Sequence, residues 1–231
     1  MGGNGKTYRY DDAYEEVVRL SDGQRVHLRL MHPDDKALLL AAFEQLSPDS
    51  RYARFMASKT KLTEQELRYL TEVDGVNHFA IGAIRRHLVG KDEGVGSARF
   101  VRMQDRPDTA EPAVTVVDSY QRKGLGSLLL QRLIEAAWER DVRWFSTELL
   151  AENTASRRMI ESLSPEVKFR PSGDGAVIAM LPLPEPDQTP TAPGFLVGTP
   201  IYRMLSQIAQ AAVSVRPRAT RPPKPPDRNG G

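Results

Sequence analysis

The spacing of hydrophobic residues changes along the chain, and each change marks an element of structure. Polar and apolar residues alternate over residues 24–31. A period of two predicts a half-buried strand. After the break at residues 32–35, apolar residues recur at helical spacing to about Leu46. This spacing predicts a helix, and Asp34 or Asp35 is placed to act as its N-cap.

Two short helices and a pair of strands complete the first half of the pattern. Residues 51–56 follow a turn with helix-capping residues and are expected to be helical. Thr63 and Glu66 have the capping-box spacing at the start of another helix. The helical spacing then ends, and residues 78–84 and 94–101 are predicted to be two strands connected by a polar hairpin.

The second half contains a short apolar run, a long amphipathic helix and a closing group of elements. Residues 113–117 are apolar, and large apolar residues and alanine then recur at helical spacing from Gly126 to Arg140. The other expected elements are a strand at 144–149, a helix at 153–163 and a hairpin with strands at 167–169 and 176–181. Strands mixed with helices in this way predict an α+β domain.

Composition separates both ends of the chain from its middle. The first 22 residues are polar and begin with a Gly-rich stretch, which predicts a flexible N-terminal arm. Residues 23–181 are expected to form one domain. Of the 17 prolines, 11 lie in residues 182–231, where six basic residues face three acidic ones. This segment is predicted to be a Pro-rich, basic and largely disordered tail, with a candidate short helix at 201–215.

Several classes of function are excluded by composition. The chain contains no cysteine, so disulfides, Cys nucleophiles and thiolate metal sites are ruled out. Its four histidines lack metal-ligand spacing, and no metal is expected. A net charge of +2 is too small to indicate binding to nucleic acid or to a membrane surface. Without a signal peptide or a long apolar run, a cytoplasmic protein is expected.

The segment 116–127 contains the residues that most clearly indicate a binding site. A strand enters a turn with two glycines, Gly124 and Gly126, and a long helix leaves it. Backbone N–H groups at a helix start lack partners and carry the positive end of the helix dipole, which favours a phosphate. The glycines allow close approach to the main chain, and Arg122 and Lys123 add positive charge. A Gly-rich helix start without a ligand is the alternative. However, a strand, a basic pair, two glycines and an amphipathic helix follow one another in the order that a phosphate site requires, which favours that site.

The turn sequence Gln121-Arg-Lys-Gly-Leu-Gly126 resembles the Gln/Arg-x-x-Gly-x-Gly/Ala signature of the GNAT superfamily of N-acetyltransferases. Residues 46–55, 62–67 and 150–153 resemble a narrower group, the acetyltransferase domain of bacterial protein lysine acetyltransferases. The similarity extends from about residue 24 to residue 181. It implies the acyl-CoA N-acyltransferase fold: a mixed, mostly antiparallel sheet flanked by helices and splayed where the cofactor enters.

The resemblance also implies acetyl-CoA as co-substrate and assigns residues to it. The strand before the turn would pair its main chain with the pantetheine arm, and the turn would wrap the pyrophosphate. Asn153 matches the family Asn that hydrogen-bonds the pantetheine, with a helix N-cap as the equal alternative. The implied cofactor-binding residues are Thr115, Val116, Val117, Arg122, Lys123, Gly124, Leu125, Gly126, Ser127 and Asn153.

Acetyl transfer to an amine needs a base for the ammonium proton and a donor for the thioester oxygen. By resemblance Glu111 is the catalytic base, and an exposed loop carboxylate is the alternative. Pro112, directly after it, removes one backbone donor. A main-chain N–H near Val117 is the expected oxygen donor. Ile160 stands where many superfamily members have a Tyr that protonates the leaving thiolate, so no such acid is expected.

These observations predict an N-acetyltransferase that moves an acetyl group from acetyl-CoA to a primary amine by direct transfer. A protein lysine is the first choice of acceptor. A small-molecule amine is the alternative, as is a non-catalytic module that senses acyl-CoA or binds a partner. The presence of Glu111 favours an enzyme. The oligomeric state and the acyl-chain preference stay open.

Overall fold

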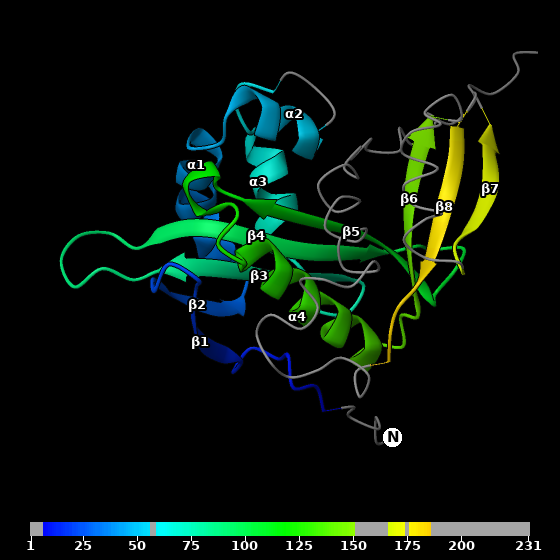
Figure 1. Cartoon of the computed structure of the whole chain (residues 1–231), viewed down its shortest axis with the longest axis horizontal. Helices are drawn as coiled ribbons and strands as arrows, with labels where there is room; N and C mark the ends of the chain where they lie inside the picture. The colour runs from blue at the N-terminus through cyan, green and yellow to red at the C-terminus, as the bar shows by residue number, and fades with distance from the viewer. Residues whose placement is uncertain (1–6, 56–58, 151–165, 174–175, 186–231) are drawn as a thin grey trace, which may run out of the picture.

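The fold is an eight-stranded sheet with helices on both of its faces (Figure 1). The computed structural model describes residues 7–55, 59–150, 166–173 and 176–185. The strands are β1 (Glu15–Arg19), β2 (Arg25–Leu30), β3 (His78–Arg85), β4 (Glu93–Arg102), β5 (Thr109–Val116), β6 (Trp144–Leu150), β7 (Lys168–Gly173) and β8 (Ala176–Pro182). The helices are α1 (Lys36–Glu44), α2 (Pro48–Phe55), α3 (Glu64–Thr71) and α4 (Leu125–Glu139), with 3₁₀ turns at Pro33–Asp35 and Asp118–Tyr120.

The order of strands in the sheet is β1-β2-β3-β4-β5-β6-β8-β7. Every neighbouring pair is antiparallel except β5 and β6, which are parallel. The predicted α+β class and the mixed, mostly antiparallel sheet are therefore confirmed. Within the described ranges, no helix is long and apolar enough to cross a membrane.

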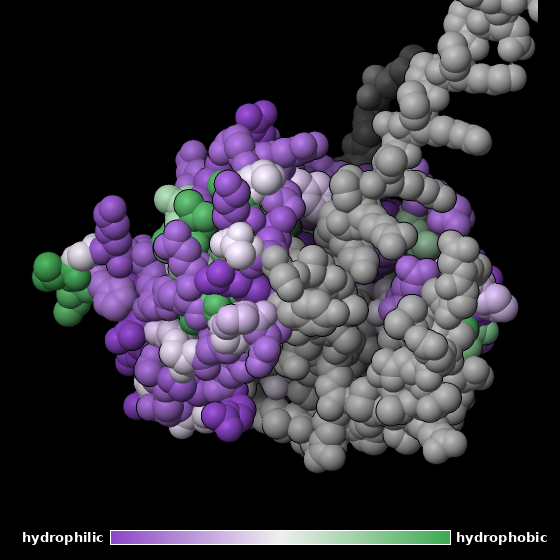
Figure 2. Space-filling view, turned by 90° about the horizontal axis from the view of Figure 1, so that it is seen from above, coloured by the Kyte–Doolittle hydropathy of each residue, from purple (hydrophilic) through white to green (hydrophobic). Residues whose placement is uncertain are grey.

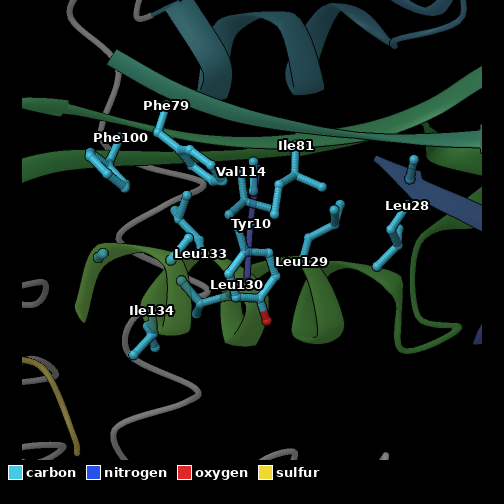
Figure 3. Packing of buried hydrophobic residues seen from close by; sticks show 14 of the residues in the cluster. Tyr10, Leu28, Phe79, Ile81, Phe100, Val114, Leu129, Leu130, Leu133 and Ile134 are labelled. Atoms are coloured by element: carbon cyan, nitrogen blue, oxygen red, sulfur yellow. The ribbon is translucent and has the colours of Figure 1, made fainter. Parts of the chain in front are cut away.

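Helix α4 covers one face of the sheet and forms the main hydrophobic core with it. Its apolar residues recur three and four positions apart, so they form one stripe that faces β3, β4 and β5. Figure 3 shows the leucines of this stripe pointing at Phe79, Ile81 and Val114 of the strands. Burying a side chain of this size contributes roughly 1.5–3 kcal/mol. The α4 residues that are at most 1% exposed are Leu125, Leu129, Leu130, Leu133, Ile134, Ala136 and Ala137.

The opposite face of the sheet is covered by α1 and α3, which share a smaller apolar cluster. This cluster consists of Phe43, Leu46, Leu62, Leu67 and Leu70. The predicted capping box begins α3: the Thr63 hydroxyl accepts from the Glu66 N–H, and the Glu66 carboxylate accepts from the Thr63 N–H. Seen from above in Figure 2, this side of the molecule is mainly polar, and an apolar knob projects at one end.

The prediction of a flexible arm for residues 1–22 is wrong for the part of this segment that the structure describes. Residues 15–19 form strand β1, which pairs with β2 along its whole length. Tyr10 is fully buried, and the Arg140 Nη2 donates to its carbonyl over 2.6 Å. Because β1 is an edge strand whose side chains are all at least partly exposed, it lacks the apolar alternation that reveals β2.

Candidate active site

The seam between β5 and β6 is paired for only two residues and is then open. Thr109 pairs with Trp144 and Ala110 with Phe145, after which no pairing joins the two strands. β5 continues to Val116 against β4, while β6 continues against β8. Figure 1 shows β6, β7 and β8 turned away from the rest of the sheet. The splay predicted at the cofactor site is therefore present.

The pairing of β5 with β4 determines which of its backbone groups face this gap. The Val117 N–H donates to the Val95 carbonyl over 3.0 Å, so odd-numbered residues of this strand point their N–H and C=O groups toward β4. Alternation then directs the N–H groups of Val114 and Val116 into the gap. The N–H of Val117 is already bonded, so the expected oxygen donor near it is not Val117 itself.

Pro112 is tolerated in β5 for the same reason. Its ring nitrogen lies on the side of the gap, where no neighbouring strand needs a donor. The strand therefore begins at Thr109, four residues before the predicted start at Ala113. Glu111 is consequently a strand residue paired with Val101, and not a loop residue that precedes the strand.

The turn after β5 ends at the N-terminus of α4. Gly124 is the N-cap of this helix with φ 88°, a left-handed conformation that favours glycine. No side chain caps the first turn, and the first intrahelical bond is donated by the Leu128 N–H to the Gly124 carbonyl. Among the described residues, the N–H groups of the three residues between them have no partner, and the dipole of a 15-residue helix lies behind them. This geometry suits a bound phosphate.

The side chains of the turn contribute unequally. Arg122 is exposed beside the helix start. Lys123 forms an ion pair with Asp22 in the β1–β2 turn, with 2.8 Å between Nζ and Oδ2, and this contact lowers the pKa of Asp22. Leu125 is fully buried, so only its main chain can reach a ligand. Arg122 is therefore the freer of the two predicted cations.

A group of polar residues that the sequence did not reveal joins this turn to α2. The Asp118 carboxylate accepts from the Ser47 N–H at 2.9 Å, the Ser47 hydroxyl at 3.0 Å and the Ser50 hydroxyl at 2.8 Å. Burial acts to raise the pKa of Asp118, but these hydrogen bonds outweigh it and keep the pKa below its usual range. The Gln121 amide donates to the Val116 carbonyl and to the Ser50 hydroxyl, both at 3.2 Å.

This network fixes the glutamine of the turn signature against the end of β5. Ser47 and Ser50 have the spacing of N-cap residues, which is all that the sequence showed of them. Their partner Asp118 lies 71 and 68 residues further along the chain. Such a contact leaves no local signal in the pattern.

Two carboxylates influence each other across the gap. Glu111 on β5 is solvent-exposed. Partial burial and the negative charge of Glu148 on β6 raise the pKa of Glu111. Glu148 itself accepts a hydrogen bond of 2.6 Å from the Ser172 hydroxyl of β7. A carboxylate with a raised pKa is a better proton acceptor than an ordinary one.

The comparisons with known proteins agree with this geometry. The family model of the acetyltransferase (GNAT) domain matches residues 25–164. The chain belongs to the GNAT acetyltransferase family. The family and its named acetyltransferase relatives support an acyltransferase enzyme, and the resemblance on which the sequence interpretation relied is confirmed.

Individual relatives of this acetyltransferase come from three bacteria. Acetyltransferase Pat of Mycolicibacterium smegmatis is 32% identical over 176 residues, which is 76% of this chain and 51% of that protein. An acetyltransferase of Pseudomonas aeruginosa is 28% identical over 167 residues, 72% of this chain and 89% of that protein. The GNAT domain of S. lividans PAT superposes with a TM-score of 0.59 at 27% identity, covering 75% of this chain and 99% of that one. The chain spans about half the length of the M. smegmatis relative.

The structure of the acetyltransferase domain brings most of the predicted site residues to one region. β5 supplies Glu111, Thr115 and Val116 on one strand, and the turn with the start of α4 supplies residues 122–127. Asn153 and Ile160 lie outside the described residues. Glu148 is an additional charged residue at the gap that sequence reasoning missed, although its strand was predicted at 144–149.

Proposed function

We propose that this domain transfers the acetyl group of acetyl-CoA to a primary amine, first of all a protein lysine, with Glu111 as general base. The observation that carries the proposal is the open edge of β5, which leads directly to the uncapped N-terminus of α4. An extended chain with amide groups and a pyrophosphate at one end fits this shape, and acetyl-CoA is such a molecule.

The proposed position of the cofactor follows from the free backbone groups. The pantetheine amides would pair with the gap-facing main chain at Val116, as an added strand does. Thr115 and Val117 hold this edge in place through their bonds to β4. The pyrophosphate would lie against the N–H groups of residues 125–127, with Gly124 shaping the turn. Arg122 and Lys123 supply charge beside it, and Asn153 keeps its proposed role with the pantetheine.

The reaction needs a neutral amine, and a lysine ammonium has an ordinary pKa of about 10.4. Glu111 would take the proton, directly or through one water. The amine nitrogen then forms a bond to the thioester carbon, the C–S bond breaks, and the electron pair leaves with the CoA sulfur. The attached nitrogen passes its extra proton to this thiolate, directly or through water, which gives the amide and the free CoA thiol. The Val114 N–H faces the gap closer to Glu111 than the Val116 N–H does, and it is our candidate donor for the developing negative charge on the carbonyl oxygen.

A protein lysine is proposed as acceptor because of two similarities. Residues 46–55 and 62–67 resemble the corresponding segments of bacterial protein lysine acetyltransferases. The M. smegmatis relative is named acetyltransferase Pat, and the S. lividans relative is the GNAT domain of PAT. A small-molecule amine and a non-catalytic acyl-CoA sensor are the competing functions.

The proposal is tested by free-thiol release from acetyl-CoA in the wild type and in Glu111→Gln. We expect the rate to fall roughly 10²–10⁴-fold in the variant, the usual contribution of a general base. Acetyl-CoA should raise the melting temperature of both proteins, because Glu111 is not part of the cofactor site. Acceptors are identified by mass spectrometry of a bacterial lysate after incubation with the enzyme and acetyl-CoA.

Each competing function has its own outcome in this experiment. Equal rates in the two proteins would remove Glu111 from the mechanism. Thermal stabilisation without thiol release for any acceptor would support the sensor. Release with small amines and no acetylated protein would support the small-molecule enzyme. An unchanged melting temperature at saturating acetyl-CoA would contradict the cofactor site.

A further inference from the structure

A cavity of about 60 Å³ lies between the sheet and the helices α1 and α3. Its walls are mainly apolar, with Leu38, Leu39 and Phe43 from the helix side. The helix side also contributes Asp35, whose carboxylate is already paired with Arg29 over 2.6 Å. The sheet side presents polar residues from two adjacent strands. They are Ser97 and Arg99 of β4 and Thr115 of β5.

The polar wall of the cavity shares a face of the sheet with Glu111. Side chains alternate along a strand, so Glu111, Ala113 and Thr115 of β5 point to one side. Ser97 is paired with Thr115, and Arg99 with Ala113. Arg99 is therefore one strand across and two residues along from Glu111. With a rise of ~3.3 Å per residue and ~4.8 Å between strands, their Cα atoms are roughly 8 Å apart.

Arg99 is a buried cation with an unused donor at Nε. Its side chain is 3% exposed and donates from Nη1 to the Leu70 carbonyl over 3.1 Å. The Nε atom is buried and has no hydrogen-bond partner in the described part of the chain. Burial lowers the pKa of Arg99 to about 10, so the guanidinium is still charged at neutral pH. Within the described ranges, no carboxylate lies at ion-pair distance from it.

The neighbours of Arg99 do not neutralise its charge. His78 lies 3.4 Å from Nη1, but burial and the Arg99 charge lower its pKa to about 4, so it is neutral. The Leu70 carbonyl is near the C-terminus of α3, where a cation is favoured by the helix dipole. This structural role accounts for one donor and leaves Nε unused. A buried, unpaired charge is strongly unfavourable and is normally matched by an anion.

We propose that Arg99 binds a carboxylate of the acceptor, which selects acceptors with an acidic group close to the reacting amine. The inference rests on the proposed function, since it places the amine at Glu111. A guanidinium binds a carboxylate through two parallel hydrogen bonds, and the Nε edge supplies such a pair of donors. The apolar cavity wall would contact the methylene groups between the two ends. The carboxylate belongs to an acidic side chain beside an acceptor lysine or to the α-carboxylate of a small amino acid.

Matched acceptors test this selection. Thiol release is measured with two peptides that differ in one position, Glu or Gln beside the acceptor lysine, and with Nα-acetyl-lysine and its amide. The wild type should favour the carboxylate member of at least one pair by about tenfold or more in kcat/KM, mainly through KM. The pair that shows the preference identifies the source of the carboxylate. In Arg99→Gln the ratio should approach one, and Arg99→Lys should retain part of it.

A purely structural role of Arg99 gives a different result, because it would lower kcat/KM for both members of a pair by the same factor. That outcome, or a wild type without preference in either pair, overturns the proposal. Thiol release that is absent with every acceptor would contradict the proposed function instead. In that case glutarate is the probe: it should raise the melting temperature of the wild type and of Arg99→Lys more than that of Arg99→Gln, while glutaramide changes none. Equal shifts with glutarate would overturn the carboxylate site.

Discussion

Strand β5 contributes to two regions that use it in different ways: the core under α4 and the gap beside β6. In the core it offers side chains, and Val114 is only 6% exposed there. At the gap it offers backbone, because the N–H of the same residue is directed away from β4. Packing of the β5 side chains under α4 can therefore fix the position of the strand, while its backbone groups at the gap stay free to bind a ligand. Changes in the two regions should separate stability from cofactor binding.

Truncation inside the core should give the largest loss of stability. Leu133 of α4 is fully buried, and Leu133→Ala should lower the free energy of unfolding by about 2–5 kcal/mol. Leu128 of the same helix is half-buried, and Leu128→Ala should cost clearly less. Urea denaturation measures both values. Equal losses in the two variants would contradict the packing of α4, and the Kd for acetyl-CoA should change little in either folded protein.

A change in the turn should have a smaller effect on stability and a larger one on binding. Gly124 has a left-handed φ of 88°, where a Cβ costs about 1–2 kcal/mol although no atom lies within 4 Å of it. Gly124→Ala should therefore lose about this much stability and weaken the thermal stabilisation by acetyl-CoA.

Gly126→Ala is the matched control for this turn. Its added Cβ would lie 3.5 Å from the Val116 Cγ2, an ordinary contact, and Ala favours the helix by about 0.5–1 kcal/mol. This variant should be slightly more stable than the wild type and should still respond to acetyl-CoA. If both variants lose the response equally, the conformation of Gly124 is not what shapes the site.

The two regions also differed in how far the sequence predicted them. The helix that covers the core could be predicted, because the apolar stripe from Gly126 to Arg140 is a local pattern. In the structure this helix, α4, spans Leu125–Glu139. The turn could also be predicted, from its two glycines and its position between a strand and a helix. The start of β5 was missed because Pro112 argues against a strand. It is tolerated there only because one edge is open, and this is a property of the whole sheet.

Residues whose contacts are distant in sequence could not be predicted. Asp118 follows β5 and reads as a residue that ends a strand, yet it binds two serines at the start of α2. Tyr10 is buried through contacts with α4 and Arg140, 130 residues away. The charge of Glu148 reaches Glu111 only because the sheet places β6 beside β5. In each case the contact depends on how distant segments are brought together by the fold, and the local sequence pattern does not predict it.

The smallest effect on stability is expected at the gap itself, for Glu148→Gln. The residue is exposed, and an amide oxygen still accepts from the Ser172 hydroxyl, so the free energy of unfolding should stay within about 0.5 kcal/mol. The effect should appear in the pH dependence of kcat/KM. Glu111 is active as a base when deprotonated, and the negative charge of Glu148 raises its pKa. Removing that charge lowers the pKa, so the acid limb of the profile should move to lower pH.

The direction of this shift distinguishes the carboxylate pair from a general change in the gap. Glu148→Asp keeps the charge at a shorter reach and should leave the acid limb close to that of the wild type. A limb that stays in place in Glu148→Gln, or that moves to higher pH, would mean that Glu111 does not titrate as the base. If the acid limb moves as expected and the free energy of unfolding does not change, the charge of Glu148 acts on the pKa of Glu111 without contributing to the stability of the core. This is expected because β5 and β6 pair with each other only at Thr109 and Ala110 of β5.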